Sequence, residues 1–294
     1  MLKFQPIGRH SRMYRRVVIA AALVMLTGAS LQAAGAKGES DSNVTRATLD
    51  NGLRVVIVRD PLAPVVTTVM NYQVGSNEAP EGFPGMAHAE EHMMFRGSPG
   101  LSADQLAAIS AAMGGDFNAD TQQNVTQYFF TVPAEDLDVA LHLEAIRMKG
   151  SLNTDDLWKE ERPALEQEVA QDLSNPQYVF YTQLLEAMFQ GTPYAHDALG
   201  SRPSFQKTTA QMLHEFYEKW YAPNNAVLVI AGNVDPEHVL AQVKALYGNI
   251  SRKTLPPRPG VNLAAVRAKA LALPTDLPYG LAIVSFRMPG STLG

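Results

Sequence analysis

Short stretches in which apolar and polar residues alternate recur along the chain, and this period of two predicts β-strands. The first two stretches, residues 45–49 and 53–59, flank Asn51-Gly52, and an Asn-Gly turn between apolar runs is a strong hairpin signal. A strand is also expected in four later ranges, the last of which is continuously apolar and suits a buried strand: 65–74, 116–121, 125–132 and 226–231.

Apolar residues spaced three and four positions apart predict helices between and after these strands. One helix has a clear start at Ser102, a predicted N-cap, and a clear end before Gly114-Gly115. The other helical ranges are 86–95, 134–149, 155–173, 177–190, 208–220 and 236–247. Strands on both sides of a helical block predict an α+β fold, in which helices pack against an antiparallel or mixed sheet in two layers.

The first 36 residues have the features of a secretory signal peptide. They carry five basic residues and no acidic residue, then an apolar run over 17–26, then small residues that end at Ala36. This segment predicts a periplasmic or secreted protein, and its apolar run is too short to leave a stable membrane span. A mitochondrial presequence is the alternative, and the Arg15-Arg16 pair leaves the twin-arginine route open beside the general secretory one.

The rest of the chain divides into four predicted parts. Polar residues 37–44 predict a flexible segment, residues 45–252 the main domain, and the Pro-rich run within 253–274 a stiff linker. Residues 275–294 are expected to be the truncated start of a second domain, because 281–286 has the pattern of a strand without a partner. We therefore expect further sequence, or another chain, to satisfy its backbone groups.

The composition narrows the chemistry that the protein can perform. The 294-residue chain has no cysteine, so any bound metal must be held by His, Asp or Glu. Its formal net charge is −5, and loss of the five basic residues of the export segment would leave −10. We expect no nucleic-acid partner, because an acidic protein lacks the basic face that replaces the counterions of phosphates.

The strongest chemical signal is the sequence His88-Ala89-Glu90-Glu91-His92, an inverted HxxEH motif. On a helix, His88 and His92 project from the same face, where two imidazoles can occupy two corners of a zinc tetrahedron. Glu91 lies beside that face and can accept a proton from a water molecule that the metal activates. A polar helix face with solvated side chains is the alternative interpretation.

A catalytic zinc needs a third protein ligand, and the acidic run over 160–169 offers candidates. On one continuous helix Glu161 and Glu168 share a face, whereas Glu166 points nearly the other way. Pro163 complicates this arrangement, because a helix that began at the proline would leave Glu161 outside it. Glu168 remains a candidate in either case. A charged and solvated helix is the alternative for this run.

The HxxEH order, followed after 75 residues by the last glutamate of an E-R-x5-E run, resembles the pitrilysin/insulinase family of zinc metallopeptidases. That family includes insulin-degrading enzyme and the mitochondrial processing peptidase, and this chain is similar to the N-terminal half of its bacterial processing-peptidase-like members. The resemblance implies one half of a clamshell fold and one zinc ion per chain, held by His88, His92 and Glu168. It also implies that Glu91 is the general base and that Glu161 is a second acidic residue supporting catalysis.

Other stretches agree with the resemblance. Residues 74–78 resemble the glycine-serine strand end before the family motif, and residues 221–236 resemble the family's late strand and closing helix. Residues 114–121 resemble a G-x-x-N-A-x-T edge strand, whose open edge would pair with an extended peptide. An ordinary strand and turn would show the same local pattern. The resemblance implies three substrate contacts in this strand: Phe117, Asn118 and Ala119.

Two positions depart from the family pattern. Glu90 stands where the family usually has an apolar or small residue. It is expected either to raise the pKa of Glu91 through its negative charge or to face solvent. Asn124 stands where an acidic residue is common, and no consequence is predicted for it.

These observations predict a zinc-dependent endopeptidase that hydrolyses peptides or unfolded protein segments. In the resembling family a second, similarly folded half closes over the site and supplies an arginine and a tyrosine. Residues 37–294 alone are therefore expected to bind zinc but to hydrolyse peptides feebly. A homologous C-terminal half, or a partner subunit in a dimer, would complete the enzyme. The alternatives are a non-catalytic subunit of a peptidase complex and a periplasmic zinc-binding protein.

Overall fold

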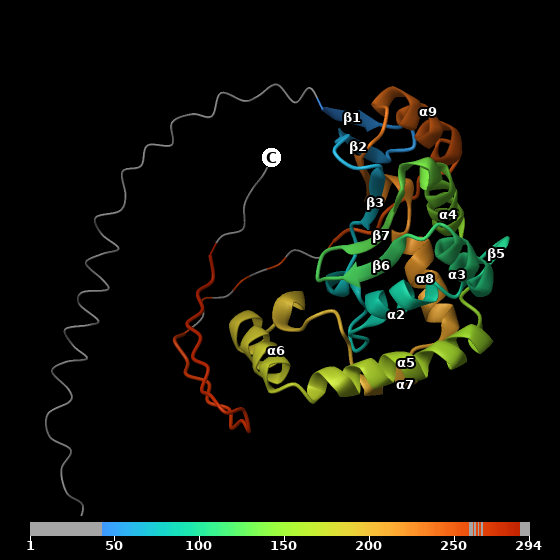
Figure 1. The fold of residues 1–294 in the computed structure, drawn as a ribbon. Coiled ribbons are helices and arrows are strands. Elements are labelled where there is room, and N and C mark those ends of the chain that lie inside the picture. Colours follow the sequence, from blue (N-terminus) through green and yellow to red (C-terminus); the bar gives the residue numbers. More distant parts are fainter. Residues whose placement is uncertain (1–42, 259–260, 262, 264, 266, 289–294) are drawn as a thin grey trace, which may run out of the picture. The chain divides into compact units, whose positions relative to one another are not determined.

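A six-stranded mixed sheet forms the centre of the computed structural model, which describes residues 43–258, 261, 263, 265 and 267–288 (Figure 1). The strands are β1 (Val44–Thr48), β2 (Arg54–Arg59), β3 (Val65–Tyr72), β6 (Asp116–Thr121), β7 (Thr126–Pro133) and β8 (Ala226–Gly232). They lie in the order β1-β2-β8-β3-β7-β6. β2 and β8 are parallel, and the other neighbours are antiparallel. The predicted mixed sheet is confirmed.

Eight helices are present in the described residues, and they match the predicted helical ranges to within three residues, apart from α7, which was not predicted. They are α2 (Met86–Met93), α3 (Ala103–Ala112), α4 (Leu137–Lys149), α5 (Asp155–Leu173), α6 (Pro176–Phe189), α7 (Arg202–Lys207), α8 (Ala210–Trp220) and α9 (Pro236–Tyr247). Short elements complete the fold: β4 (Gly97–Ser98), β5 (Leu101–Ser102), η1 (Ser76–Glu78), η2 (Ala134–Asp136), η3 (Pro193–Ala195) and η4 (Pro223–Asn225).

One face of the sheet forms the hydrophobic core with the helices. Alternate residues of β3 from Val66 to Tyr72 are completely buried, and β7 alternates in the same way from Thr126 to Val132. This is the expected result when one face of a pleated strand packs against a core. Helices α2, α4 and α9 contact strands of the sheet, so the zinc motif on α2 lies directly against the sheet.

Helix α5 settles the question that Pro163 raised. The helix continues through the proline, so Glu161 and Glu168 lie on one helix, as their predicted shared face requires. The proline removes one backbone hydrogen bond. Buried Trp158 and Leu165, on either side of it, hold the helix against the core.

Several expectations concern the ends of the chain. The predicted signal peptide, residues 1–36, lies outside the described residues, and so does most of the predicted flexible segment 37–44. β1 begins at Val44, so the last residue of that segment belongs to the sheet. None of the helices in the described ranges is long and apolar enough to cross a membrane.

The strand predicted over 281–286 is wrong, because residues 267–288 contain neither strand nor helix. A strand needs a neighbour for its backbone N–H and C=O groups, and no described strand pairs with this segment. Its apolar side chains are consequently exposed, as Val284 and Phe286 show at 80% each. Closer to the domain, the predicted linker is fixed by an ion pair between Arg258 and Glu78 at 3.3 Å.

Candidate metal centre

Helix α2 presents the two histidines of the motif on one side. It starts after Gly85, whose φ of 88° lies in the left-handed region that favours glycine. A Cβ on Gly85 would meet the backbone of Gly200 and the ring of Phe205 at less than 3 Å, so only glycine allows this close packing. The start of α2 is thereby fixed, and the rings of His88 and His92 lie with their centroids 4.8 Å apart.

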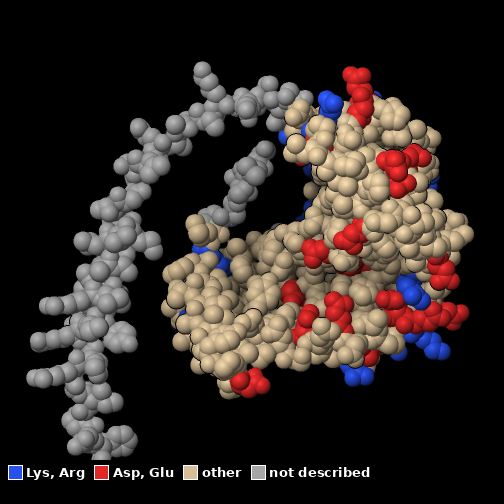
Figure 2. Space-filling view, in the orientation of Figure 1, with Lys and Arg blue, Asp and Glu red and all other residues tan. Residues whose placement is uncertain are grey.

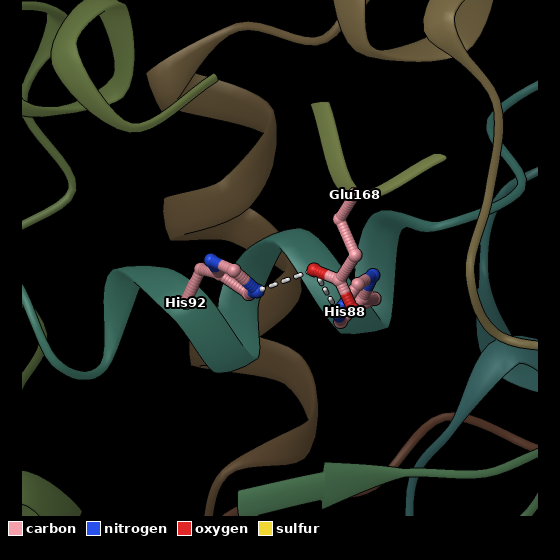
Figure 3. A group of neighbouring side chains, drawn as sticks. All are labelled: His88, His92 and Glu168. Carbon is pink, nitrogen blue, oxygen red and sulfur yellow. Dashed lines mark ion pairs between the residues drawn. The ribbon is translucent and has the colours of Figure 1, made fainter. Parts of the chain in front are cut away.

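Helix α5 brings the carboxylate of Glu168 to this pair (Figure 3). Its Oε2 lies 3.6 Å from Nε2 of His88 and 3.5 Å from Nε2 of His92. Zinc ligands at about 2.1 Å in tetrahedral geometry lie roughly 3.4 Å from one another, which is close to both distances. Two imidazoles and one carboxylate are also a donor set typical of catalytic zinc, so these residues fit that ion.

Both imidazoles keep Nε2 available for a metal because Nδ1 is engaged elsewhere. Nδ1 of His88 lies 3.2 Å from the carbonyl oxygen of Leu199, which can only accept, so Nδ1 is the nitrogen that carries the proton. Nδ1 of His92 lies 2.8 Å from Oε1 of Glu161. Partners of this kind orient a ligating histidine, fix its tautomer and raise its basicity.

The acidic groups around His92 stabilise positive charge at this point. Burial by itself lowers the pKa of His92, but hydrogen bonds with Glu161 and Glu168 and the charge of Glu91 raise it to about 9. The hydrogen bond with His92 lowers the pKa of Glu168, against the opposing effect of partial burial. Surroundings that favour a proton on His92 also suit a divalent cation, which competes with that proton for the imidazole.

Glu91 stands beside the ligand face, between α2 and β6. Its Oε2 accepts a hydrogen bond from Oγ1 of Thr121 at 2.5 Å. Burial raises the pKa of Glu91, and the charge of His88 and the bond from Thr121 act against that rise. A buried carboxylate with a raised pKa is suited to accept a proton and release it again.

Glu161 lies behind His92 and contacts the ligand rather than the open groove. Besides its bond to His92, it pairs with Nε of Arg96 at 3.3 Å. Only 15% of its side chain is exposed. The structure therefore brings Glu161 to the site as the partner that orients His92.

A groove of about 470 Å³ opens beside the three ligand residues. Residues 118–121 of β6 form one side of it, and Asp172, Tyr178 and residues 197–199 border the other. Figure 2 shows acidic side chains on both sides of the hollow between β6 and α5. The groove is therefore acidic and reaches the position where a metal would bind.

The predicted substrate residues lie on β6, which pairs only with β7 and keeps its other edge open in the described sheet. Asn118 is exposed and Ala119 half-buried, and both line the groove. Phe117 differs, because its ring stacks on Phe130 at 5.5 Å and borders a second hollow next to Glu161. The structure thus brings Asn118 and Ala119 to the metal groove and Phe117 to the hollow beside it.

The expectation that Glu90 faces solvent is wrong. The residue is 0% exposed, and one carboxylate oxygen accepts a hydrogen bond from Nδ2 of Asn153 at 2.9 Å. Neighbouring helix residues are rotated by about 100°, which turns Glu90 away from the ligand face. Burial raises the pKa of Glu90 well above its usual range, and the nearby polar side chains of Asn153 and Ser151 act against that rise.

The structure also adds groups for which the sequence analysis predicts no role. Thr121 was part of the matched edge-strand motif, and its place two residues after Ala119 puts it on the strand face that meets α2. The carbonyl of Leu199 and the side chains of Tyr178 and Asp197 come from segments without any metal-site pattern. No local sequence signal could have found them.

Comparisons with known proteins identify the family of the chain. The family profile described as insulinase, peptidase family M16, matches residues 54–202, and the profile described as the peptidase M16 inactive domain matches residues 207–293. An uncharacterized zinc protease of Mycobacterium leprae is 30% identical over 234 residues, which cover 76% of this chain and 52% of that protein. The zinc protease PqqE of Helicobacter pylori is 28% identical over 256 residues, or 84% of this chain and 56% of that protein. The chain spans about half the length of the curated relatives it matches.

Solved structures share the fold. A protease from Helicobacter pylori matches with a TM-score of 0.70 at 26% identity, covering 75% of this chain and 53% of that one. Pitrilysin matches with a TM-score of 0.69 at 26% identity, covering 76% and 24%. The first half of the periplasmic protease PqqL from Escherichia coli matches in fold, with a TM-score of 0.71 at 21% identity and coverage of 76% and 50%. The resemblance is confirmed: the chain belongs to the insulinase family of peptidases, peptidase family M16.

Proposed function

We propose that this protein is a zinc-dependent endopeptidase whose zinc is held by His88, His92 and Glu168. The observation that carries the proposal is the convergence of two Nε2 atoms and one carboxylate oxygen, with Glu91 beside them. The zinc protease names of the relatives support the same reaction class.

His88, His92 and Glu168 would hold the zinc ion, which would supply Lewis-acid chemistry: polarisation of the scissile carbonyl and a lower pKa for a water molecule. Glu91 accepts the proton of that water and passes it to the nitrogen that leaves the cleaved bond. Thr121 occupies Oε2 of Glu91, so Oε1 is the oxygen available to the water. The raised pKa of Glu91 helps the carboxyl group to hold the proton between the two transfers.

The substrate is proposed to be a peptide or an unfolded segment of a protein. The open edge of β6 can pair with an extended chain through main-chain hydrogen bonds, and Asn118 and Ala119 lie where such a chain would pass the metal. A folded protein whose strands all pair within its own sheets would have to expose one of them before it could pair with this edge. Phe117 would contact side chains that enter the neighbouring hollow.

Full activity is proposed to need a second half. The reaction develops negative charge on the former carbonyl oxygen, which requires a hydrogen-bond donor or a cation. No lysine or arginine is among the described residues that line the metal groove, so the groove offers no cation for this role, and the hydroxyl groups of Tyr178 and Thr121 already donate to Asp197 and Glu91. A homologous C-terminal half or a partner subunit would supply that group, and the chain alone would hydrolyse peptides feebly.

The protein is proposed to act in the periplasm or outside the cell. Its first 36 residues have the charge pattern, apolar run and small-residue end of an export signal. The similar half structure of PqqL comes from a periplasmic protease, which agrees with that location.

Replacement of the general base tests the proposal. Glu91→Gln is expected to keep one zinc per chain and to lower peptide hydrolysis by at least about 10²-fold, because the amide cannot accept the proton. Zinc content would be measured by elemental analysis and hydrolysis with a fluorogenic peptide. Glu186→Gln is the matched control, because Glu186 is an exposed residue of α6 that does not line the groove. A wild-type chain without zinc, or equal hydrolysis by Glu91→Gln, would refute the proposal and favour a non-catalytic or zinc-carrying role.

A further inference from the structure

The carboxyl group of Glu90 is buried on the metal helix, and the proposed mechanism does not use it. The side chain is completely buried, with one oxygen bonded to Nδ2 of Asn153 at 2.9 Å. The other oxygen has no hydrogen-bond partner among the described residues. Burial of a polar group costs free energy, and an apolar side chain would fill this position without that cost. The presence of a carboxyl group here therefore points to a specific bond.

The position of Glu90 on α2 suggests what this bond does. Residues two apart on a helix differ by about 200° in direction, so Glu90 lies almost opposite both His88 and His92. Helix α2 has only eight residues, and a directional bond on its back limits rotation about its axis. Such a rotation would swing both Nε2 atoms away from the carboxylate of Glu168.

The partner of Glu90 belongs to the segment that leads into the other ligand helix. Asn153 is followed by Thr154, whose Oγ1 accepts a hydrogen bond from the N–H of Leu157 and caps the start of α5. Ser151 Oγ donates to Oδ1 of Asn153 at 3.3 Å, which restrains the amide. The bond from Asn153 thus joins the back of α2 to the start of the helix that carries Glu168.

We infer that Glu90 and Asn153 are a pair of positioning residues that sets the two ligand-bearing helices in register for the metal. Helix α2 supplies two ligands and α5 supplies the third, and the Glu90–Asn153 bond joins α2 to the segment before α5 on the side away from the groove. The inference rests on the proposed zinc site. It extends that site to two residues that touch neither the metal nor the substrate.

Zinc affinity of the full chain tests this inference, measured by competition with a chromogenic chelator well below the unfolding temperature. Asn153→Ala removes the donor at a half-buried position and is expected to weaken zinc binding by about 10-fold, the lower end of the effect of removing a residue bonded directly to a metal ligand. Glu90→Gln keeps an oxygen that can accept from Asn153 and is expected to bind zinc like the wild type. Glu90→Ala removes the acceptor and should match Asn153→Ala.

Asn175→Ala is the matched control, because it removes an asparagine that caps α6, outside both ligand helices. It should lower the thermal midpoint in chelator but leave zinc affinity unchanged. The inference is overturned if Asn153→Ala binds zinc as the wild type does, or if Asn175→Ala weakens binding equally, which would indicate general destabilisation. It is also overturned if Glu90→Gln is as weak as Glu90→Ala, because charge would then be the cause. A wild-type chain that binds no zinc would instead refute the proposed function.

Discussion

The two ligand-bearing helices, α2 and α5, differ from α6, the other helix at the groove, in how many of their side chains are buried. Helix α2, which carries the histidines, buries seven of its eight residues, and the ligand helix α5 is anchored by three buried side chains: Trp158, Leu165 and Val169. Helix α6 has 14 residues, and none of them is fully buried. Polar and aromatic contacts to the segment after it hold it, such as the 2.6 Å bond from Tyr178 to Asp197.

This difference teaches how the site divides its tasks. Metal ligands must stay within a few tenths of an ångström of one geometry, and buried side chains on both ligand helices restrain them. A segment with few buried contacts opens at a lower free energy than the core does. In the proposed enzyme, the α6 part of the groove would therefore adjust to different peptides while the metal side would remain fixed.

The largest expected effect follows removal of the third ligand. Glu168→Ala leaves two imidazoles, fewer than the three protein ligands of catalytic zinc sites, so zinc content and hydrolysis should fall below detection. Glu166→Ala is the matched control, because Glu166 lies on the same helix but pairs with Arg162 and Arg202. Elemental analysis after dialysis measures the outcome, and a zinc-loaded Glu168→Ala protein would remove Glu168 from the ligand set.

Truncation of a buried side chain next to α2 and of a half-buried one in α6 tests whether the two regions contribute differently to the free energy of unfolding. Phe205 is completely buried against Gly85 and Gly200, so Phe205→Ala should lower the free energy of unfolding by about 3–5 kcal/mol. Leu184→Ala in α6, where the side chain is only half-buried, should cost less than about 2 kcal/mol. Urea unfolding in the presence of chelator gives both values. Equal losses of unfolding free energy in the two variants would contradict the proposed difference between the α2 region and α6.

A smaller effect on zinc binding is expected from replacement of Glu161, the hydrogen-bond partner of His92. Glu161→Gln replaces the carboxylate that orients the ring, and zinc should bind about 10- to 100-fold more weakly. Glu160→Gln is the control, because Glu160 is exposed and pairs only with Arg96 among the described residues. Chelator competition measures both dissociation constants. If the Glu161→Gln protein holds zinc as tightly as the wild type, Glu161 does not position the ligand.

The smallest effect is expected at the side of the groove that α6 forms. Tyr178→Phe removes the bond to Asp197, worth about 1 kcal/mol, and should change the KM for peptides by about fivefold without altering zinc affinity. Tyr181→Phe, at a more exposed position of the same helix, should change neither quantity. Steady-state kinetics with a fluorogenic peptide would measure KM. A loss of zinc in Tyr178→Phe would show that α6 supports the metal after all.

Most secondary structure was predictable because it depends on local periodicity. The alternation over 125–132 and the Asn51-Gly52 turn placed strands to within two residues. Helix α7 was not predicted, because its six residues are too few to show a helical period. The strand expected over 281–286 failed for another reason: a strand needs a neighbour, and an apolar pattern does not provide one.

The candidate site was predictable in part. His88, Glu91 and His92 fall within one helical turn, so their spacing alone predicts a shared face. His92 and Glu168 are separated by 75 intervening residues, and only the family resemblance joined the two before the structure did. The burial of Glu90 could not be foreseen, because two adjacent glutamates look alike in sequence and differ only in what packs around them.

The sequence by itself determined which donors are available, which of them share a helix face and to which family the chain is related, because these depend on residue identity and on local spacing. The tertiary structure decided that Glu168 meets both histidines, that the carbonyl of Leu199 sets the tautomer of His88 and that Asn153 reaches the back of α2. These contacts join residues that are far apart in the chain. Burial and packing of the sheet and helices, rather than any local pattern, bring them together.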